Sequence, residues 1–250
     1  MRFFLQIQNK SLDIHPHSFN SLHMSISQHD ILLTALFAIG LFQWFWLSVM
    51  LVRKGITPSS IRLYMTPLLG IWVLMWPAYS DPVIPLLSLS LLILPLLLGM
   101  RNTPFARHLR LAWHTTPEQI RQPTPWLMTG LSLALSAILF DLAPELGLGV
   151  GLSFCLAWGG AELLDKLGKG ALLGLNNNPF QTLAGHLFLV LGTSVICAWA
   201  LQLYHGITWQ QFMVATLIAG LIASMIRALV PQGWNMPLSI LGMSVTLWLL

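Results

Sequence analysis

The stretch ILLTALFAIGLFQWFWLSVMLV, residues 31–52, contains no acidic, basic or histidine side chain. A helix needs about 20 mainly apolar residues to cross the ~30 Å hydrocarbon core of a bilayer. This run has that length and that composition. It therefore predicts a helix that spans a membrane.

The rest of the chain has the same character. Of its 250 residues, 56% are hydrophobic and only 8% are Asp, Glu, Lys or Arg, whereas soluble domains carry about 25% of these charged residues. We predict an all-α fold, a polytopic transmembrane helix bundle of about eight spans. Seven spans are the alternative, because a helix over the last apolar run would reach only ~21 Å. The further apolar runs are 64–80, 82–100, 126–144, 147–165, 183–204, 208–227 and 237–250.

Two regions of different character make up the chain. Residues 1–29 are mixed and polar and lack the pattern of a signal peptide, so we predict a polar, disordered N-terminal arm. Residues 30–250 are predicted to form a single transmembrane helical domain, because the apolar runs follow one another evenly. Metal binding by the arm is the alternative, since it holds His15, His17, His23 and His29.

The charges between the runs give an orientation. The acids Asp81, Asp141 and Glu145 lie in one set of alternate gaps, and that set has no Lys or Arg. The positive-inside rule then predicts an integral, multi-pass protein with its N-terminus outside and its basic loops cytoplasmic. Orientation accounts for the basic residues, so no nucleic-acid partner is predicted. The basic gaps hold ten of the 12 Lys and Arg residues: Arg53, Lys54, Arg62, Arg101, Arg107, Arg110, Arg121, Lys166, Lys169 and Arg227.

Tryptophans lie close to the predicted ends of the spans. Trp72, Trp76 and Trp158 are among those within a turn or two of an end. Because indole rings favour the membrane–water interface, we expect most of the tryptophans near span ends to be interfacial anchors. The full set is Trp44, Trp46, Trp72, Trp76, Trp126, Trp158, Trp199, Trp209 and Trp234.

Two carboxylates lie where the fifth run ends. Glu162 and Asp165 are three residues apart, so they share one helix face. Paired carboxylates can hold Mg²⁺, which makes both residues candidate metal ligands and catalytic groups. Lys169, close behind, is a candidate phosphate-binding residue. In the alternative, this is a solvated helix end whose acids are neutralised by Lys166 and Lys169.

A polar turn follows, LNNNPFQTLAG at residues 175–185. Asparagines before a proline and a helix start are typical of a turn rich in hydrogen-bond donors and acceptors. The free N–H groups at the start of the next helix would point into it, and such helix ends bind phosphate. The alternative is a loop with a helix cap. The candidates for binding a phosphate group here are Asn176, Asn177, Asn178 and Gln181.

Four further residues are candidates for binding phosphate or substrate. Arg227 and Asn235 frame the gap after the seventh run; in the alternative, Arg227 only marks the inner edge of that span. Arg107 and Arg110 belong to a basic stretch, 101–121. This stretch either lies on the membrane surface and attracts anionic lipid heads, or is only a topology signal.

The order of these segments resembles the membrane family of CTP-dependent polyprenol kinases (phytol kinase and dolichol kinase), which is related to phosphatidate cytidylyltransferase. That family has a Gly-Asp segment, a Lys–Thr/Ser–aromatic–Glu–Gly segment entering a helix, and a Glu–Pro–Gly–Asp-Asn–Pro-Leu segment before its last span. The resemblance covers roughly residues 55–250. The corresponding positions here are Gly159-Gly160-Ala161 through Gly168-Lys169, then Asn178-Pro179-Phe180-Gln181-Thr182, then Arg227, Pro231, Gly233, Trp234, Asn235, Pro237 and Leu238, with Arg62, Thr66, Gly70 and Trp72 upstream.

The resemblance implies a CTP- and Mg²⁺-dependent kinase or cytidylyltransferase at the cytoplasmic face. Its substrate would be a membrane lipid, either a polyprenol- or phytol-type alcohol or phosphatidate. Gly160, Gln181 and Arg227 stand where the family has acids, so Glu162 and Asp165 would have to hold the metal. The loss of those acids supports an alternative, a catalytically degenerate relative that serves as a membrane scaffold or as a lipid- or pigment-binding subunit of a membrane-protein partner. A small transporter is a third alternative.

Overall fold

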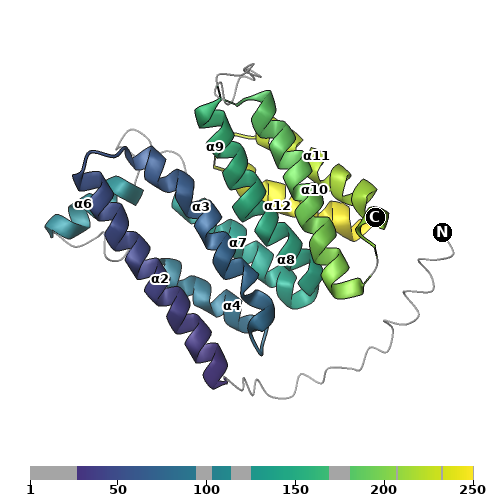
Figure 1. Cartoon of the computed structure of the whole chain (residues 1–250), viewed down its shortest axis with the longest axis horizontal. Helices are drawn as coiled ribbons and strands as arrows, with labels where there is room; N and C mark the ends of the chain where they lie inside the picture. The colour runs from purple at the N-terminus through teal and green to yellow at the C-terminus, as the bar shows by residue number, and fades with distance from the viewer. Residues whose placement is uncertain are drawn as a thin grey trace.

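The computed structural model describes residues 27–93, 103–113, 125–168, 181–206, 208–231 and 233–249. The predicted all-α fold is confirmed for these residues (Figure 1). Short 3₁₀ segments, η1 (Trp76–Ala78), η2 (Leu89–Ile93) and η5 (Trp209–Gln211), lie between the α-helices, and a π-helical segment, η4, covers Ser153–Trp158. The α-helices are α2 (Gln28–Arg53), α3 (Pro58–Leu74), α4 (Val83–Ser88), α6 (Pro104–Trp113), α7 (Pro125–Leu142), α8 (Pro144–Leu152), α9 (Gly159–Leu167), α10 (Leu183–His205), α11 (Met213–Leu229) and α12 (Asn235–Leu249).

Three helices in the described part of the chain are long and apolar enough to cross a membrane. They are α2, the continuous helix Pro144–Leu167 formed by α8, η4 and α9, and α10. The other apolar helices have 10–17 residues. The runs predicted at 64–80 and 82–100 are both interrupted: α3 ends at Leu74 before η1, and α4 has only six residues. Pro77 explains the first interruption, because it has no N–H group to continue α3.

Helix α2 begins at Gln28, so the last two residues of the predicted arm belong to this helix. Ser27 and Asp30 form a capping box: the Asp30 N–H donates to Ser27 Oγ (3.1 Å) and the Ser27 N–H donates to Asp30 Oδ2 (3.0 Å). The N–H of Ser80 donates to Asp30 Oδ1 (2.8 Å), which ties the turn before α4 to this end of α2. Residues 1–26 of the predicted arm lie outside the described residues.

The continuous α8–η4–α9 helix is the centre of the bundle. It contacts α3, α7 and α10, while α2 and α6 lie on one side of the molecule and α10 and α11 on the other (Figure 1). Three glycines of α8 allow these neighbouring helices to pack closely against it. We call them the glycine seam: Gly147, Gly149 and Gly151. A Cβ at Gly147 would collide with the backbone of Phe140 in α7, and a Cβ at Gly149 would lie 3.2 Å from Ala200 Cβ in α10. The absence of side chains therefore lets three helices approach α8 closely.

Aromatic side chains join α2 and α3 to α7. The rings of Phe37 (α2) and Trp72 (α3) are stacked at 4.5 Å between centroids, and the rings of Trp76 and Phe140 (α7) are 5.4 Å apart. Trp72, Trp76 and Trp158 are all buried. The predicted interfacial anchoring is therefore wrong for these three tryptophans, which are packing residues of the core, whereas Trp46, Trp199 and Trp234 are exposed.

Candidate functional site

The π-helical segment η4 leads into α9, which carries two residues of the candidate site, Glu162 and Asp165. One extra residue per turn widens the helix here, a feature frequent at functional sites, and the segment ends at Trp158. Two glycines follow: a Cβ at Gly159 would press on Pro67 of α3 (2.8 Å to Cδ), and a Cβ at Gly160 would collide with Phe188 of α10. Helix α9 therefore fits between α3 and α10, and this position brings Glu162 and Asp165 to the start of α10.

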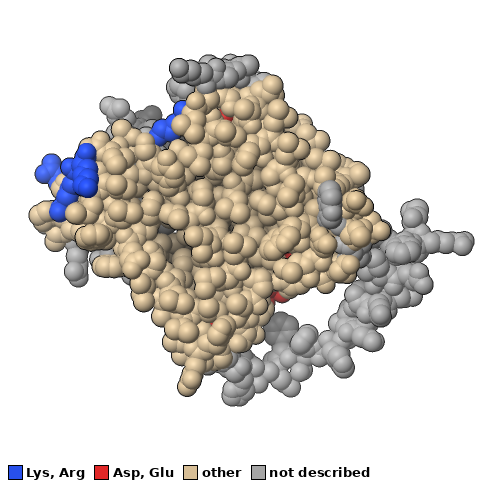
Figure 2. Space-filling model, in the orientation of Figure 1, with Lys and Arg blue, Asp and Glu red and all other residues tan. Residues whose placement is uncertain are grey.

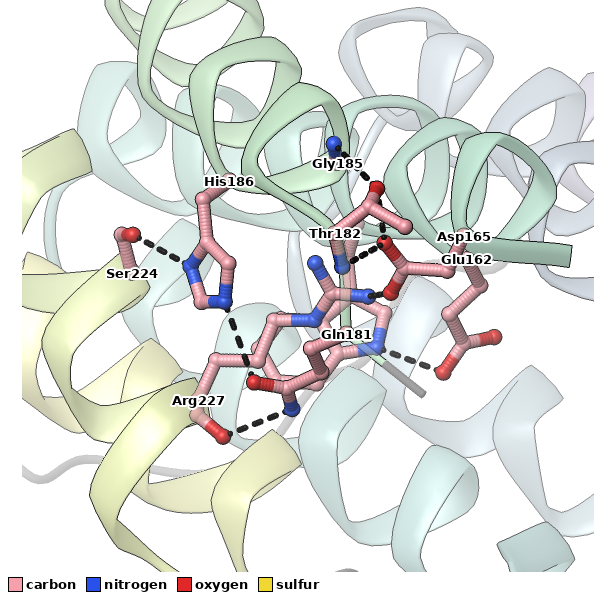
Figure 3. Close-up of polar contacts among 9 residues, drawn as sticks. Glu162, Asp165, Gln181, Thr182, Gly185, His186, Ser224 and Arg227 are labelled. Atoms are coloured by element: carbon pink, nitrogen blue, oxygen red, sulfur yellow. Dashed lines mark hydrogen bonds and ion pairs between the residues drawn. The ribbon is translucent and has the colours of Figure 1, made fainter. Parts of the chain in front are cut away.

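Asp165 is at the centre of a buried polar cluster drawn from three helices (Figure 3). Its Oδ1 accepts hydrogen bonds from the N–H (2.9 Å) and the Oγ1 (2.8 Å) of Thr182. Its Oδ2 accepts a hydrogen bond from Arg227 Nη2 at 2.6 Å, and the side chains of Arg227 and Asp165 are only 3% and 12% exposed. Both oxygens of this carboxylate are thus in use, and the ion pair is buried.

The start of α10 has a specific relation to that carboxylate. Thr182 is the N-cap, with its Oγ1 accepting from the N–H of Gly185 at 3.1 Å. A Cβ at Gly185 would collide with Asp165 Oδ1, so glycine is needed for the carboxylate to come this close. A helix N-terminus favours an anion. The helix end that the sequence predicted for a phosphate is therefore occupied by the side chain of Asp165.

Arg227 is enclosed on several sides. Its guanidinium carbon lies 5.3 Å from the centroid of the Trp158 ring, a cation–π distance. The indole Nε1 of Trp158 in turn donates to Glu162 Oε1 at 2.9 Å. The Nη1 of Arg227 is buried without a hydrogen-bond partner among the described residues. Trp158 thus contacts Arg227 with its ring face and Glu162 with its N–H group. Because Arg227 binds Asp165, Trp158 connects the two predicted carboxylates indirectly.

Gln181, His186 and Ser224 continue the cluster into α10 and α11. Gln181 Nε2 donates to the backbone oxygen of Arg227 (3.0 Å), which turns Gln181 Oε1 toward His186 Nε2 (3.0 Å). An amide oxygen only accepts, so His186 Nε2 carries a proton. His186 Nδ1 lies 2.7 Å from Ser224 Oγ. In neutral His186 this nitrogen accepts the hydroxyl proton of Ser224.

This arrangement does not fit Mg²⁺. A divalent cation needs free carboxylate oxygens and an approach without competing positive charge, but Asp165 gives both oxygens to Thr182 and Arg227. A metal at Asp165 would also meet the guanidinium of Arg227. Among the described residues there is no group of three or more His, Cys, Asp or Glu side chains that could hold a metal.

The other predicted site residues divide into three groups. Arg107 is exposed on α6, on the side of the bundle away from α10 and α11 (Figure 1), and the backbone of Arg110 lies in the same helix. Asn235 is buried at the start of α12, where its Oδ1 accepts from the N–H of Gly233 at 3.2 Å. The remaining candidates lie outside the described residues: Lys169, Asn176, Asn177 and Asn178.

The structure therefore brings together three residues of the predicted set, Asp165, Gln181 and Arg227. Glu162 joins them by its hydrogen bond to Trp158, whose ring contacts Arg227. His186 and Ser224 complete the cluster and were not predicted. His186 carried a usable signal, since an ionisable residue inside an apolar run marks a site by default. Ser224 carried none, because a lone serine in an apolar helix is ordinary.

Comparison with known proteins gives no relative. The chain matches no family model, no curated protein and no solved structure.

Proposed function

We propose that this chain is a multi-pass membrane protein that serves as a scaffold subunit for a membrane-protein partner, with the layout of the polyprenol kinases but without metal-dependent phosphoryl transfer. One observation carries the proposal. The carboxylate of Asp165, which metal binding would require, is bound to Arg227 at 2.6 Å and to Thr182 at 2.8 and 2.9 Å. Its charge is thus used to join α9, α10 and α11.

The membrane placement in this proposal has about eight spans, with the N-terminus outside and the basic loops cytoplasmic. Support comes from the three long apolar helices and from five shorter ones. Apolar side chains also lie on the outer surface: Phe42, Trp46 and Leu191 are 62%, 54% and 57% exposed. Such surfaces suit contact with lipid or with another membrane protein.

Titration calorimetry of the detergent-purified full chain with CTP, with and without Mg²⁺, tests the proposal. The expected result is no saturable heat in either titration, from protein that unfolds cooperatively in a parallel thermal scan. Turnover of CTP should also be absent with a long-chain alcohol or with phosphatidate as acceptor. Purification from native membranes should yield a complex of fixed stoichiometry with a second membrane protein.

The CTP-dependent lipid kinase or cytidylyltransferase remains the second candidate, on one observation. Glu162 and Asp165 lie together on α9, beside the start of α10 (Figure 3). Metal binding there would require Arg227 to leave Asp165. Saturable binding of Mg·CTP and turnover that Glu162→Gln abolishes, while the unfolding temperature is kept, would establish this function and overturn the scaffold proposal.

A further inference from the structure

A second feature lies far from the polar cluster, between α2 and α3. These helices enclose a groove of about 350 Å³, a volume within the range of small-molecule sites. Its lining is apolar and aromatic except for Gln43, and Gly40 on α2 gives it room, because a Cβ there would meet no atom within 4 Å. The groove therefore suits a flexible hydrocarbon chain.

Basic side chains lie beyond the end of this groove that is nearer to the C-terminus of α2. Arg53 and Lys54 end α2, and Arg107 lies on α6, which packs against both α2 and α3. All three are exposed. Figure 2 shows Lys and Arg side chains gathered at the corner of the molecule where α2 ends and α6 lies. We call these three residues the basic corner.

The distances along α2 match one leaflet of a bilayer. The groove extends from Leu36 to Leu47, which is ~16 Å at 1.5 Å per residue, and Arg53 is ~9 Å farther along. Together these give ~25 Å, against ~20–23 Å for half of a bilayer with its headgroups. A lipid phosphate at the level of Arg53 would thus place its acyl chain in the groove.

We infer that an anionic phospholipid occupies this site, with its phosphate at the basic corner and one acyl chain in the α2–α3 groove. Charge complementarity selects the headgroup, because cations at a membrane surface attract anionic lipids, and the groove selects a bilayer lipid over a free phosphate. The inference rests on the membrane placement proposed above. It does not rest on the loss of phosphoryl transfer, so the two proposals can fail separately.

Native mass spectrometry of the full chain tests the headgroup. The protein is equilibrated with phosphatidylglycerol and phosphatidylcholine of identical acyl chains, and we expect the anionic lipid to be retained preferentially. The combined variant Arg53→Gln, Lys54→Gln, Arg107→Gln should lose about fivefold in that preference for each cation removed. Lys166→Gln, which removes a cation at α9, should keep the preference. Inorganic phosphate should not displace the lipid.

A matched pair of glycine variants tests the groove. Gly40→Leu places a side chain in the groove and should reduce lipid retention, whereas Gly130→Leu, at another helical glycine with free space around its Cβ, should not. Equal retention of the two lipids by the native chain would overturn the inference. So would a preference that survives the triple substitution, or retention that Gly40→Leu leaves unchanged.

Discussion

The polar cluster and the glycine seam both hold α10 against the central helix, by opposite means. In the cluster, α9, α10 and α11 are joined by the charge pair Asp165–Arg227 and the hydrogen bonds around it. In the seam, Gly147 and Gly149 let α7 and α10 approach because no side chain intervenes. Directional polar contacts join the bundle at the α9 end of the central helix, and close van der Waals contact joins it at the α8 end. The two regions should therefore respond differently to substitution.

The largest effect is expected from breaking the charge pair. Arg227→Met leaves the carboxylate of Asp165 buried without its cation, and removal of one partner of a buried pair costs about 3–5 kcal/mol. The free energy of unfolding, measured by SDS titration in mixed micelles, should fall by that amount. Lys166→Met removes an exposed cation from α9 and is the control, expected to change stability by less than about 0.5 kcal/mol. Wild-type stability in Arg227→Met would show that the pair does not hold the helices together.

The glycine seam should respond to a single methyl group. Gly147→Ala places a Cβ against the backbone of Phe140, which cannot rotate away, and overpacking of this kind costs about 1–3 kcal/mol. The same unfolding titration measures the loss. Gly130→Ala, on α7 with open space around its Cβ, is the control and should keep or slightly raise stability. Equal results for the two variants would mean that the α7–α8 contact is looser than described.

The cap of α10 should have an intermediate effect. Thr182→Val removes the hydroxyl that both donates to Asp165 and accepts from the N–H of Gly185, and loss of an N-cap costs about 1–2 kcal/mol. Thr182→Ser keeps the hydroxyl and should recover most of the loss. Thermal unfolding of both variants in one detergent checks this. A serine variant as unstable as the valine variant would point to the methyl group instead.

The smallest effect is expected at the opposite end of α10. His205 Nε2 lies 3.5 Å from Glu145 Oε1, and the His205 side chain is 43% exposed. Exposed ion pairs contribute about 0–1 kcal/mol, and about 1 kcal/mol shifts the unfolding temperature of a chain of this size by about 2–4 °C, so His205→Gln should lower the unfolding temperature by no more than about 4 °C. A larger drop would show that this end of the bundle also depends on charge.

Much of the fold followed from local sequence. Apolar runs predicted the long helices, and α2 and α10 end where glycine adopts a left-handed backbone, at Gly55 (φ 83°) and Gly206 (φ 64°). The π-helical segment was not predictable, because it has no periodicity that separates it from an α-helix. The interruption after Leu74 reflects Pro77, whose missing N–H group hydropathy alone does not weigh.

The candidate site was only partly predictable, for a related reason. Asp165, Gln181 and Arg227 were chosen for their chemistry, but nothing local shows that Arg227 reaches a carboxylate 62 residues earlier in the chain. Such a pairing depends on how α9 and α11 pack. Each of these residues, considered separately in the sequence, suggested binding to a metal ion or a phosphate. In the structure Arg227 binds Asp165, and Gln181 binds the backbone oxygen of Arg227.

A double-mutant cycle on Asp165 and Arg227 tests the central claim most directly. It compares the free energies of unfolding of the native chain, Asp165→Asn, Arg227→Met and the double variant. We predict that each single variant loses stability and that the double variant recovers much of the loss, with a coupling energy of about 2–3 kcal/mol. Losses that simply add, or single variants as stable as the native chain, would contradict the claim that the charge of Asp165 is used to hold the bundle together.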